Sequence, residues 1–145
     1  MMSPEIRNAR TRIQAAVLLG VVVLSRPGCT FETETGPLAI GTWGGDHMLI
    51  EIDQSAARVD FDCAHGTINL PIMLSDGDFS ATGTFTQEHG APIPDGDTEP
   101  TFPARYFGNV RGDRMTITVS LTSENRTVGS FELKRGSSGR VSKCP

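Results

Sequence analysis

Length, composition and charge set the first limits on this chain. It has 145 residues and a formal net charge of −4, with 13 basic and 17 acidic side chains. Without residues 1–28, nine basic and sixteen acidic side chains remain, a net charge of −7. Phosphate binding requires clusters of Lys and Arg, and residues 29–145 contain no basic run. The balance therefore argues against nucleic acid or an anionic membrane surface as a partner, and favours a self-repelling monomer of one domain.

Residues 1–28 have the pattern of an export segment. Three arginines precede an apolar run of 12 residues, Ile13–Leu24, which only Gln14 interrupts. A membrane span needs about 20 residues. The shorter run with its basic flank is typical of a secretory signal, and the alternative is a buried helix. We therefore expect an exported protein that is secreted, periplasmic or attached to the outside of the cell membrane.

A cysteine directly follows the export segment. Gly28-Cys29 resembles the lipid-attachment box of bacterial lipoproteins, in which a small residue precedes the cysteine, although Arg26 stands where that box has an aliphatic residue. The resemblance implies lipid attachment at Cys29, and the alternative is a signal without lipid. Any contact with a membrane is then expected only through the N-terminal segment or this lipid. Residues 29–40 are mostly polar and are expected to form a flexible tether to a domain at residues 41–145.

From Gly41 onward, apolar and polar residues alternate with a period of two, which is typical of strands. The clearest alternation is the run from Met115 to Leu121. The expected strands lie within Gly41–Asp53, Ala57–His65, Thr67–Met73, Phe79–Thr86, Ala104–Val110, Met115–Leu121 and Thr127–Lys134.

Glycine-containing turns separate these strands, and the expected turns are His65-Gly66, Asp76-Gly77-Asp78 and Arg111-Gly112-Asp113. No helical period appears after residue 28. The chain is therefore expected to be all-β, a small antiparallel β-barrel of seven or eight strands preceded by an N-terminal export helix. A β-sandwich is the alternative.

Residues 88–103 interrupt the strand pattern with four prolines and two glycines. Proline removes a ladder hydrogen bond, so no strand is expected in this segment. Long loops in compact domains are usually functional or disordered. We expect the segment to open the rim of the barrel.

Cys63 and Cys144 are the cysteines of the expected domain. A bridge between them would hold the C-terminus, which otherwise frays. Such bridges form in exported proteins. The alternative is two unpaired, small apolar side chains.

The opening segment carries a resemblance to known barrels. Gly41-Thr42-Trp43 resembles the Gly-x-Trp that begins the first strand of lipocalins, avidins and related calycin barrels. In those families the Trp closes one end of the barrel and packs near an Arg on the last strand, which implies these roles for Trp43 and Arg135. The domain also resembles small exported bacterial proteins of unknown function, through Gly-Thr-Trp-Gly-Gly at 41–45, Asp-Cys-Ala-His-Gly at 62–66 and Glu-His-Gly at 88–90.

The three histidines, His47, His65 and His89, are candidate metal ligands. Three imidazoles can hold Zn²⁺ with one open position, as in catalytic zinc sites. Their spacing matches no metal motif, and the alternative is a set of structural or rim histidines. No nucleophile elbow or phosphate-binding glycine loop is present in the sequence.

These observations favour an exported β-barrel binding module over an enzyme, with no catalytic residues and no required cofactor. Its partner is expected to be an unidentified small molecule or protein, held at the rim where residues 88–103 open. A zinc-dependent hydrolase using His47, His65 and His89 is one alternative. An envelope structural or inhibitor protein is another.

Overall fold

The structure is a computed structural model that describes residues 34–90 and 98–144. The described residues belong to one compact unit. The expected export helix within residues 1–28 and the expected lipid site at Cys29 lie outside them.

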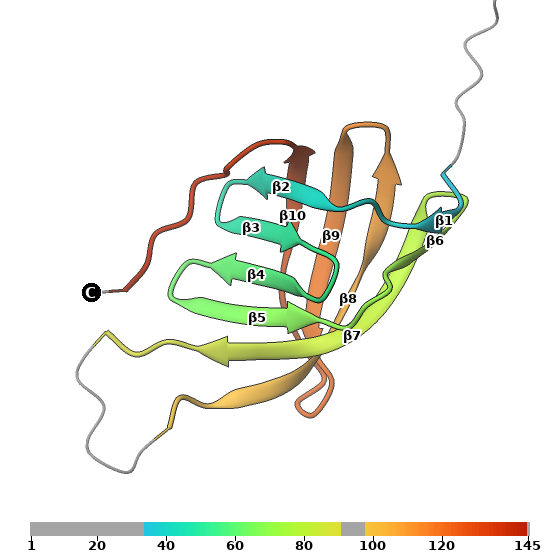
Figure 1. The fold of residues 1–145 in the computed structure, drawn as a ribbon. Helices are drawn as coiled ribbons and strands as arrows, with labels where there is room; N and C mark the ends of the chain where they lie inside the picture. Colours follow the sequence, from blue (N-terminus) through green and yellow to red (C-terminus); the bar gives the residue numbers. More distant parts are fainter. Residues whose placement is uncertain (1–33, 91–97, 145) are drawn as a thin grey trace, which may run out of the picture. The chain divides into compact units, whose positions relative to one another are not determined.

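Ten strands are found in this part of the chain (Figure 1). They are β1 (Gly36–Pro37), β2 (Gly41–Gly45), β3 (Met48–Ile52), β4 (Ala57–Phe61), β5 (Ala64–Ile68), β6 (Met73–Ser75), β7 (Asp78–Gln87), β8 (Thr101–Arg111), β9 (Arg114–Leu121) and β10 (Arg126–Arg135). Within the described ranges the chain forms no helix that is long and apolar enough to span a bilayer.

Eight of the strands close into an antiparallel barrel. They follow one another as β2, β3, β4, β5, β7, β8, β9 and β10, and β10 pairs back onto β2. β6 pairs with the first residues of β7, and β1 extends the sheet beyond β6. The prediction of an all-β antiparallel barrel with seven or eight strands is confirmed.

The barrel closes over three residue pairs between β10 and β2. Leu133 lies opposite Gly45, Lys134 opposite Gly44, and Arg135 opposite Trp43. A Cβ on Gly45 would overlap the carbonyl oxygen of Glu132, and one on Gly44 would overlap the backbone of Gly139. Glycine is therefore needed at both positions, because the neighbouring backbone comes too close for any side chain.

The interior is filled by apolar side chains from alternate positions of the strands. The fully buried ones include Met48, Ile50, Tyr106, Ile117, Val119 and Leu121. The ring of Phe61 lies between two other rings, with its centroid 5.3 Å from that of Phe85 and 5.7 Å from that of Phe131. Tilted aromatic pairs at such distances stabilise a core beyond the burial of their area.

One expected strand, Ala57–His65, is in fact a hairpin. β4 ends at Phe61, residues 62–63 form the turn, and β5 begins at Ala64. Cys63 adopts a positive φ of 52°, which is uncommon for a residue other than glycine. The predicted turn at His65-Gly66 is wrong because Gly66 lies inside β5, where a Cβ would overlap the carbonyl oxygen of Thr84.

The expected strand Thr67–Met73 is also divided. β5 ends at Ile68 and β6 begins at Met73. Pro71 lies between them and follows a cis peptide bond. Proline cannot donate to a ladder, so a central strand does not continue through this position.

β8 starts within the segment from which strands were excluded. It begins at Thr101 and includes Pro103, so that part of the prediction is wrong. β9 pairs no further than Leu121, which lies opposite Ala104. The carbonyl of Pro103 accepts a hydrogen bond from the N–H of Thr122 at 3.0 Å. The nitrogen of Pro103 points toward the same neighbour as its carbonyl. Because β9 has already ended there, the missing N–H of proline costs no hydrogen bond between β8 and β9.

The barrel unit also begins before residue 41. Gly36–Pro37 pairs with β6, and Leu38 is a buried member of the core. The N–H of Leu38 donates to the carbonyl of Ile72 at 2.8 Å. Residues 34–38 of the expected tether are therefore bonded to the barrel, and Leu38 supplies an apolar side chain that the core buries.

Candidate functional site

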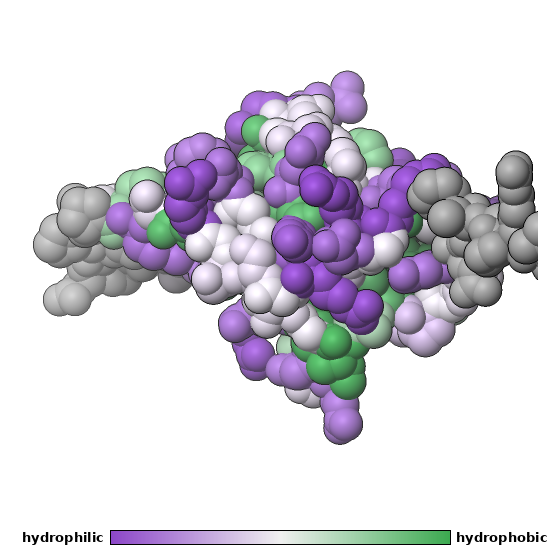
Figure 2. Space-filling model, turned by 90° about the horizontal axis from the view of Figure 1, so that it is seen from above, coloured by the Kyte–Doolittle hydropathy of each residue, from purple (hydrophilic) through white to green (hydrophobic). Residues whose placement is uncertain are grey.

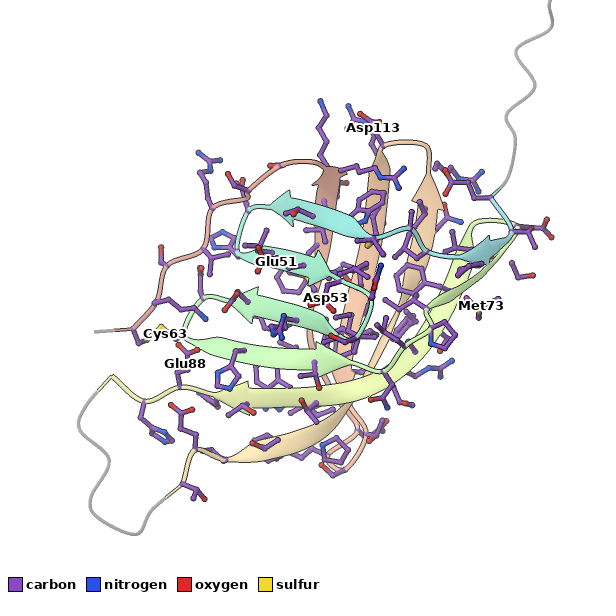
Figure 3. The ribbon with its side chains drawn as sticks, viewed as in Figure 1. Glu51, Asp53, Cys63, Met73, Glu88 and Asp113 are labelled. Atoms are coloured by element: carbon purple, nitrogen blue, oxygen red, sulfur yellow. A yellow bond between two sulfur atoms is a disulfide. The ribbon has the colours of Figure 1, made fainter. Side chains whose placement is uncertain are left out.

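The C-terminal tail, residues 136–144, is bound covalently to the β4–β5 turn. Cys63 and Cys144 form a disulfide, which confirms the predicted pairing. Their Cα atoms lie 4.8 Å apart, within the usual range for a bridge. Figure 3 shows Cys63 near Glu88, on the side of the barrel that the tail reaches.

Hydrogen bonds hold the tail along two turns of the barrel. The N–H of His47 donates to the carbonyl of Arg140 at 2.8 Å, and that of Cys63 to the carbonyl of Ser142 at 3.1 Å. The N–H of Ser142 donates to the carboxylate of Asp62 at 2.7 Å. This bond, followed by the one from His47, holds the pKa of Asp62 below its usual value.

Lys143, the residue before Cys144, lines a polar pocket of about 420 Å³. Its Nζ lies 2.7 Å from Asp60 Oδ1 and 3.0 Å from Glu88 Oε1. His65 Nδ1 lies 3.0 Å from the same oxygen of Glu88. Desolvation raises the pKa of Glu88, but the hydrogen bonds from Lys143 and His65 outweigh it and the net shift is downward. The charges of this pocket are thus largely satisfied by one another.

The three histidines are not assembled into one group. His47 lies in the β2–β3 turn with Nδ1 2.5 Å from Asp62 Oδ2, whereas His65 lies in β5 and contacts Glu88. His89 is exposed beyond the end of β7. In residues 34–90 and 98–144, no three or more His, Cys, Asp or Glu side chains are placed to hold a metal ion.

Trp43 and Arg135 are brought together at the closure of the barrel. Trp43 is 1% exposed, and the guanidinium carbon of Arg135 lies 5.5 Å from the centroid of its ring. A cation over an indole face at this distance is attracted by the ring quadrupole. The pair therefore stabilises the seam between β2 and β10.

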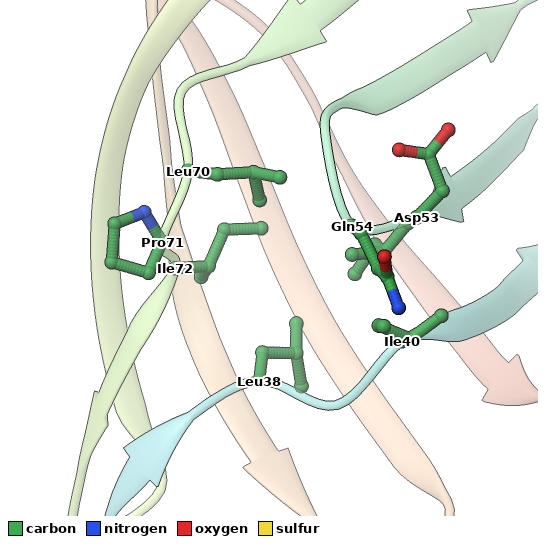
Figure 4. A pocket seen from close by; sticks show the side chains of 8 residues that line it. Leu38, Ile40, Asp53, Gln54, Leu70, Pro71 and Ile72 are labelled. Atoms are coloured by element: carbon green, nitrogen blue, oxygen red, sulfur yellow. The ribbon is translucent and has the colours of Figure 1, made fainter.

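A second pocket, the apolar pocket, opens between three connections of the barrel (Figure 4). Its volume is about 370 Å³. It is lined by Leu38, Ile40, Ile52, Asp53, Gln54, Leu70, Pro71 and Ile72. Figure 4 shows Leu38, Ile40 and Leu70 facing the space between the β1–β2 and β5–β6 connections.

The polar members of this lining differ in their freedom to bind a ligand. Asp53 Oδ1 accepts hydrogen bonds from Ser55 and from the N–H of Ala56, and Oδ2 accepts one from Arg58. The bonds from Ser55, followed by that from Ala56, lower the pKa of Asp53. Its carboxylate therefore holds the β3–β4 turn. Gln54 is exposed, and Figure 4 shows its amide extending toward Ile40.

The apolar pocket was not predicted from the sequence. Its lining comes from residues 38–40, 52–54 and 70–72. The first range belonged to the expected tether, the second to the end of the expected strand Gly41–Asp53 and the residue after it, and the third to the expected strand Thr67–Met73. The available signal was the apolar character of Leu38, Ile40 and Leu70 in segments that are not regular strands. Sequence reasoning looked for the site at residues 88–103. Of these, residues 88–90 follow the last residue of β7, whereas β6 pairs with the first residues of β7 (Figure 1).

Comparison with protein-family models, with curated proteins and with solved structures finds no match for this chain. The closed eight-stranded antiparallel barrel is compatible with the calycin-like resemblance at the level of architecture.

Proposed function

We propose that the chain is an exported β-barrel binding module and that the apolar pocket holds its small ligand. The carrying observation is the pocket itself, an open space of about 370 Å³ with a mostly apolar lining. Ligand pockets of this kind have mostly apolar walls and a few polar groups that orient the ligand. Export is supported by the Cys63–Cys144 disulfide, because such bridges persist in oxidising compartments.

The lining indicates the chemistry of the ligand. Leu38, Ile40 and Leu70 offer apolar contact. Gln54 is the polar side chain of the lining whose amide is best placed to bond a ligand. The carboxylate of Asp53 is already used by its own turn. We therefore expect a neutral molecule with an apolar body and one hydrogen-bonding group.

The polar pocket supports a ligand less well. Lys143, Glu88, Asp60 and His65 already bond to one another there. A ligand would have to displace these contacts, which leave no charged side chain of this group without a partner.

A titration with a neutral, apolar naphthylamine dye tests the proposal on the full chain. Ile40 and Met73 are both exposed large apolar residues, at 58% and 53%, and only Ile40 lines the pocket. Ile40→Gln is expected to weaken dye binding about fivefold, since it removes on the order of 1 kcal/mol of apolar contact.

Met73→Gln is the matched control and is expected to leave the affinity unchanged. Equal affinities for all three proteins would refute the proposal. So would an equal loss in both variants, because that would indicate general surface adsorption rather than a pocket.

A further inference from the structure

The C-terminal tail runs along the β2–β3 and β4–β5 turns and bonds to them through its backbone (Figure 1). The N–H of Arg140 donates to the carbonyl of Gly45, and the carbonyl of Arg140 accepts the N–H of His47, both at 2.8 Å. Two residues later, the carbonyl of Ser142 accepts the N–H of Cys63 at 3.1 Å. Main-chain bonds of this kind also hold separate peptide ligands to proteins.

Two basic side chains of the tail are seated on acidic groups. The guanidinium of Arg140 lies with Nη2 2.7 Å from Asp46 Oδ1. The ammonium of Lys143, three residues later, has three oxygen partners. They are Asp60 Oδ1 at 2.7 Å, Glu88 Oε1 at 3.0 Å and the carbonyl oxygen of Ala64 at 3.0 Å. Because an ammonium has three hydrogens to donate, these oxygens can satisfy it completely.

The surface that receives the tail is acidic. We call this surface the tail site, and its carboxylates are those of Asp46, Asp60, Asp62 and Glu88. Arg58, which also lines the polar pocket, is already paired on the β3–β4 turn. His47 and His65 each bond to one of the four carboxylates and are charged only when protonated. Arg140 and Lys143 therefore supply the cations that match this surface.

Residues 136–144 have no buried apolar anchor. None of them is fully buried, and none belongs to the hydrophobic core. Figure 2 looks down on the end of β10 where the tail begins, and it shows hydrophilic side chains near the centre of this side. Segments with few buried apolar contacts open more easily than the fold as a whole. The Cys63–Cys144 disulfide is therefore the attachment that keeps the tail closed.

We propose that the tail is an autoinhibitory strap on a site for basic peptides, and that reduction of the Cys63–Cys144 disulfide by a dithiol opens this site. Two electrons and two protons pass from the dithiol to the bridge, which yields two protein thiols and the disulfide of the reductant. The freed tail then exchanges with a peptide segment that carries Arg and Lys three residues apart. This inference is independent of the ligand in the apolar pocket.

Hydrogen exchange of the full chain tests the release of the tail. Reduction with dithiothreitol should speed exchange of the His47 and Cys63 amides by about tenfold or more, because their acceptors lie in the tail. The amide of Ile117, in β9 between β8 and β10, should keep its rate. Unchanged rates at His47 and Cys63 would overturn the proposal. An equal acceleration at Ile117 would overturn it too, since the whole barrel would then have opened.

Fluorescence anisotropy tests the site with a labelled peptide, Gly-Arg-Val-Ser-Lys, which copies residues 139–143. In the reduced full chain, Arg140→Gln with Lys143→Gln should raise the affinity for this peptide about fivefold, because the strap loses its two ion pairs and competes less well. Oxidation of the same variant should lower the affinity about tenfold, because the bridge again holds the tail on the site.

The matched control is Arg126→Gln with Lys134→Gln, which makes the same change in net charge away from the tail site. It should leave the affinity within about twofold of the reduced parent. The peptide Gly-Gln-Val-Ser-Gln should bind to neither variant. Asp60→Asn, added to the strap variant, should weaken binding of the basic peptide about threefold.

Three results would overturn the assignment of the site. They are an equal gain in the strap and control variants, equal binding of the basic and neutral peptides, and an unchanged affinity after oxidation. If the double strap variant does not fold, Lys143→Gln alone replaces it, with an expected gain of about threefold. No gain in that variant would overturn the assignment in the same way.

Discussion

At the scale of single residues, Trp43 is the position on which the closure of the barrel depends. Its ring is buried, its strand β2 lies between β3 and β10, and the guanidinium of Arg135 lies over the ring. Gly44 and Gly45 follow directly and allow backbone to pass where side chains would overlap it. The Trp43 ring fills the core, whereas the two glycines let the backbone of β10 and of the tail come close to β2.

Trp43→Ala is expected to destabilise the protein by about 3–5 kcal/mol, as large-to-small changes in a core do. Arg135→Gln removes only the stacked cation and should cost about 0.5–1 kcal/mol, because Arg135 is exposed. Urea unfolding followed by circular dichroism measures both. A loss for Trp43→Ala no greater than that for Arg135→Gln would contradict the role given to the ring, as would a red-shifted fluorescence of Trp43 in the native protein.

At the scale of elements, the C-terminal tail is fixed to the outside of the barrel and is not a free chain end. It bonds to the β2–β3 and β4–β5 turns, forms the bridge Asp46–Arg140, and ends in the disulfide. The pattern of hydrophobic residues did not show this, because the tail is held by hydrogen bonds, ion pairs and the disulfide.

Cys63→Ser is expected to lower the free energy of unfolding by about 2–4 kcal/mol in oxidised protein, since the bridge closes a long loop. The matched control is Cys29→Ser, which leaves the bridge intact and should not change stability. Chemical denaturation with and without reductant measures the effect. Finding both thiols free in protein from an oxidising compartment, or equal losses in the two variants, would contradict the expectation.

At the scale of the whole molecule, carboxylates with lowered pKa values link the stability of the barrel to pH. The pKa values of Asp53, Asp62 and Glu88 are all depressed in the folded protein. Two of these groups bond to the tail, and the third holds the β3–β4 turn. Stability gained from such groups is present above their unfolded pKa values and is lost as the pH falls through the folded values.

The free energy of unfolding should therefore stay nearly constant from neutral pH to about pH 5 and decline below about pH 4.5. Asp62→Asn should lower stability at neutral pH and make the decline less steep, because one linked group is removed. Urea titrations at several pH values measure both. A free energy of unfolding that stays constant below about pH 4.5 would contradict the linkage.

Features of the fold that depend on neighbouring residues could be predicted from the sequence, and features that depend on distant segments could not. The all-β class, the alternation from Met115 to Leu121 and the hairpin at Gly112 were predicted because period-two burial and turn chemistry are properties of neighbouring residues. The hairpin at Asp62 and Cys63 was missed because neither residue is a glycine, although Cys63 adopts a positive φ. Pro103 was wrongly excluded from a strand, because a proline is tolerated in β8 only where the partner strand β9 has already ended.

The sequence by itself determined the inner and outer faces of most strands, the glycines beside Trp43 and the pair of cysteines available for a bridge. Only the tertiary structure decided which strands close the barrel and that Leu38 and Ile72 meet at the apolar pocket. The physical reason is strand register. Backbone hydrogen bonds between distant segments decide which side chains become neighbours, and no local pattern contains that information.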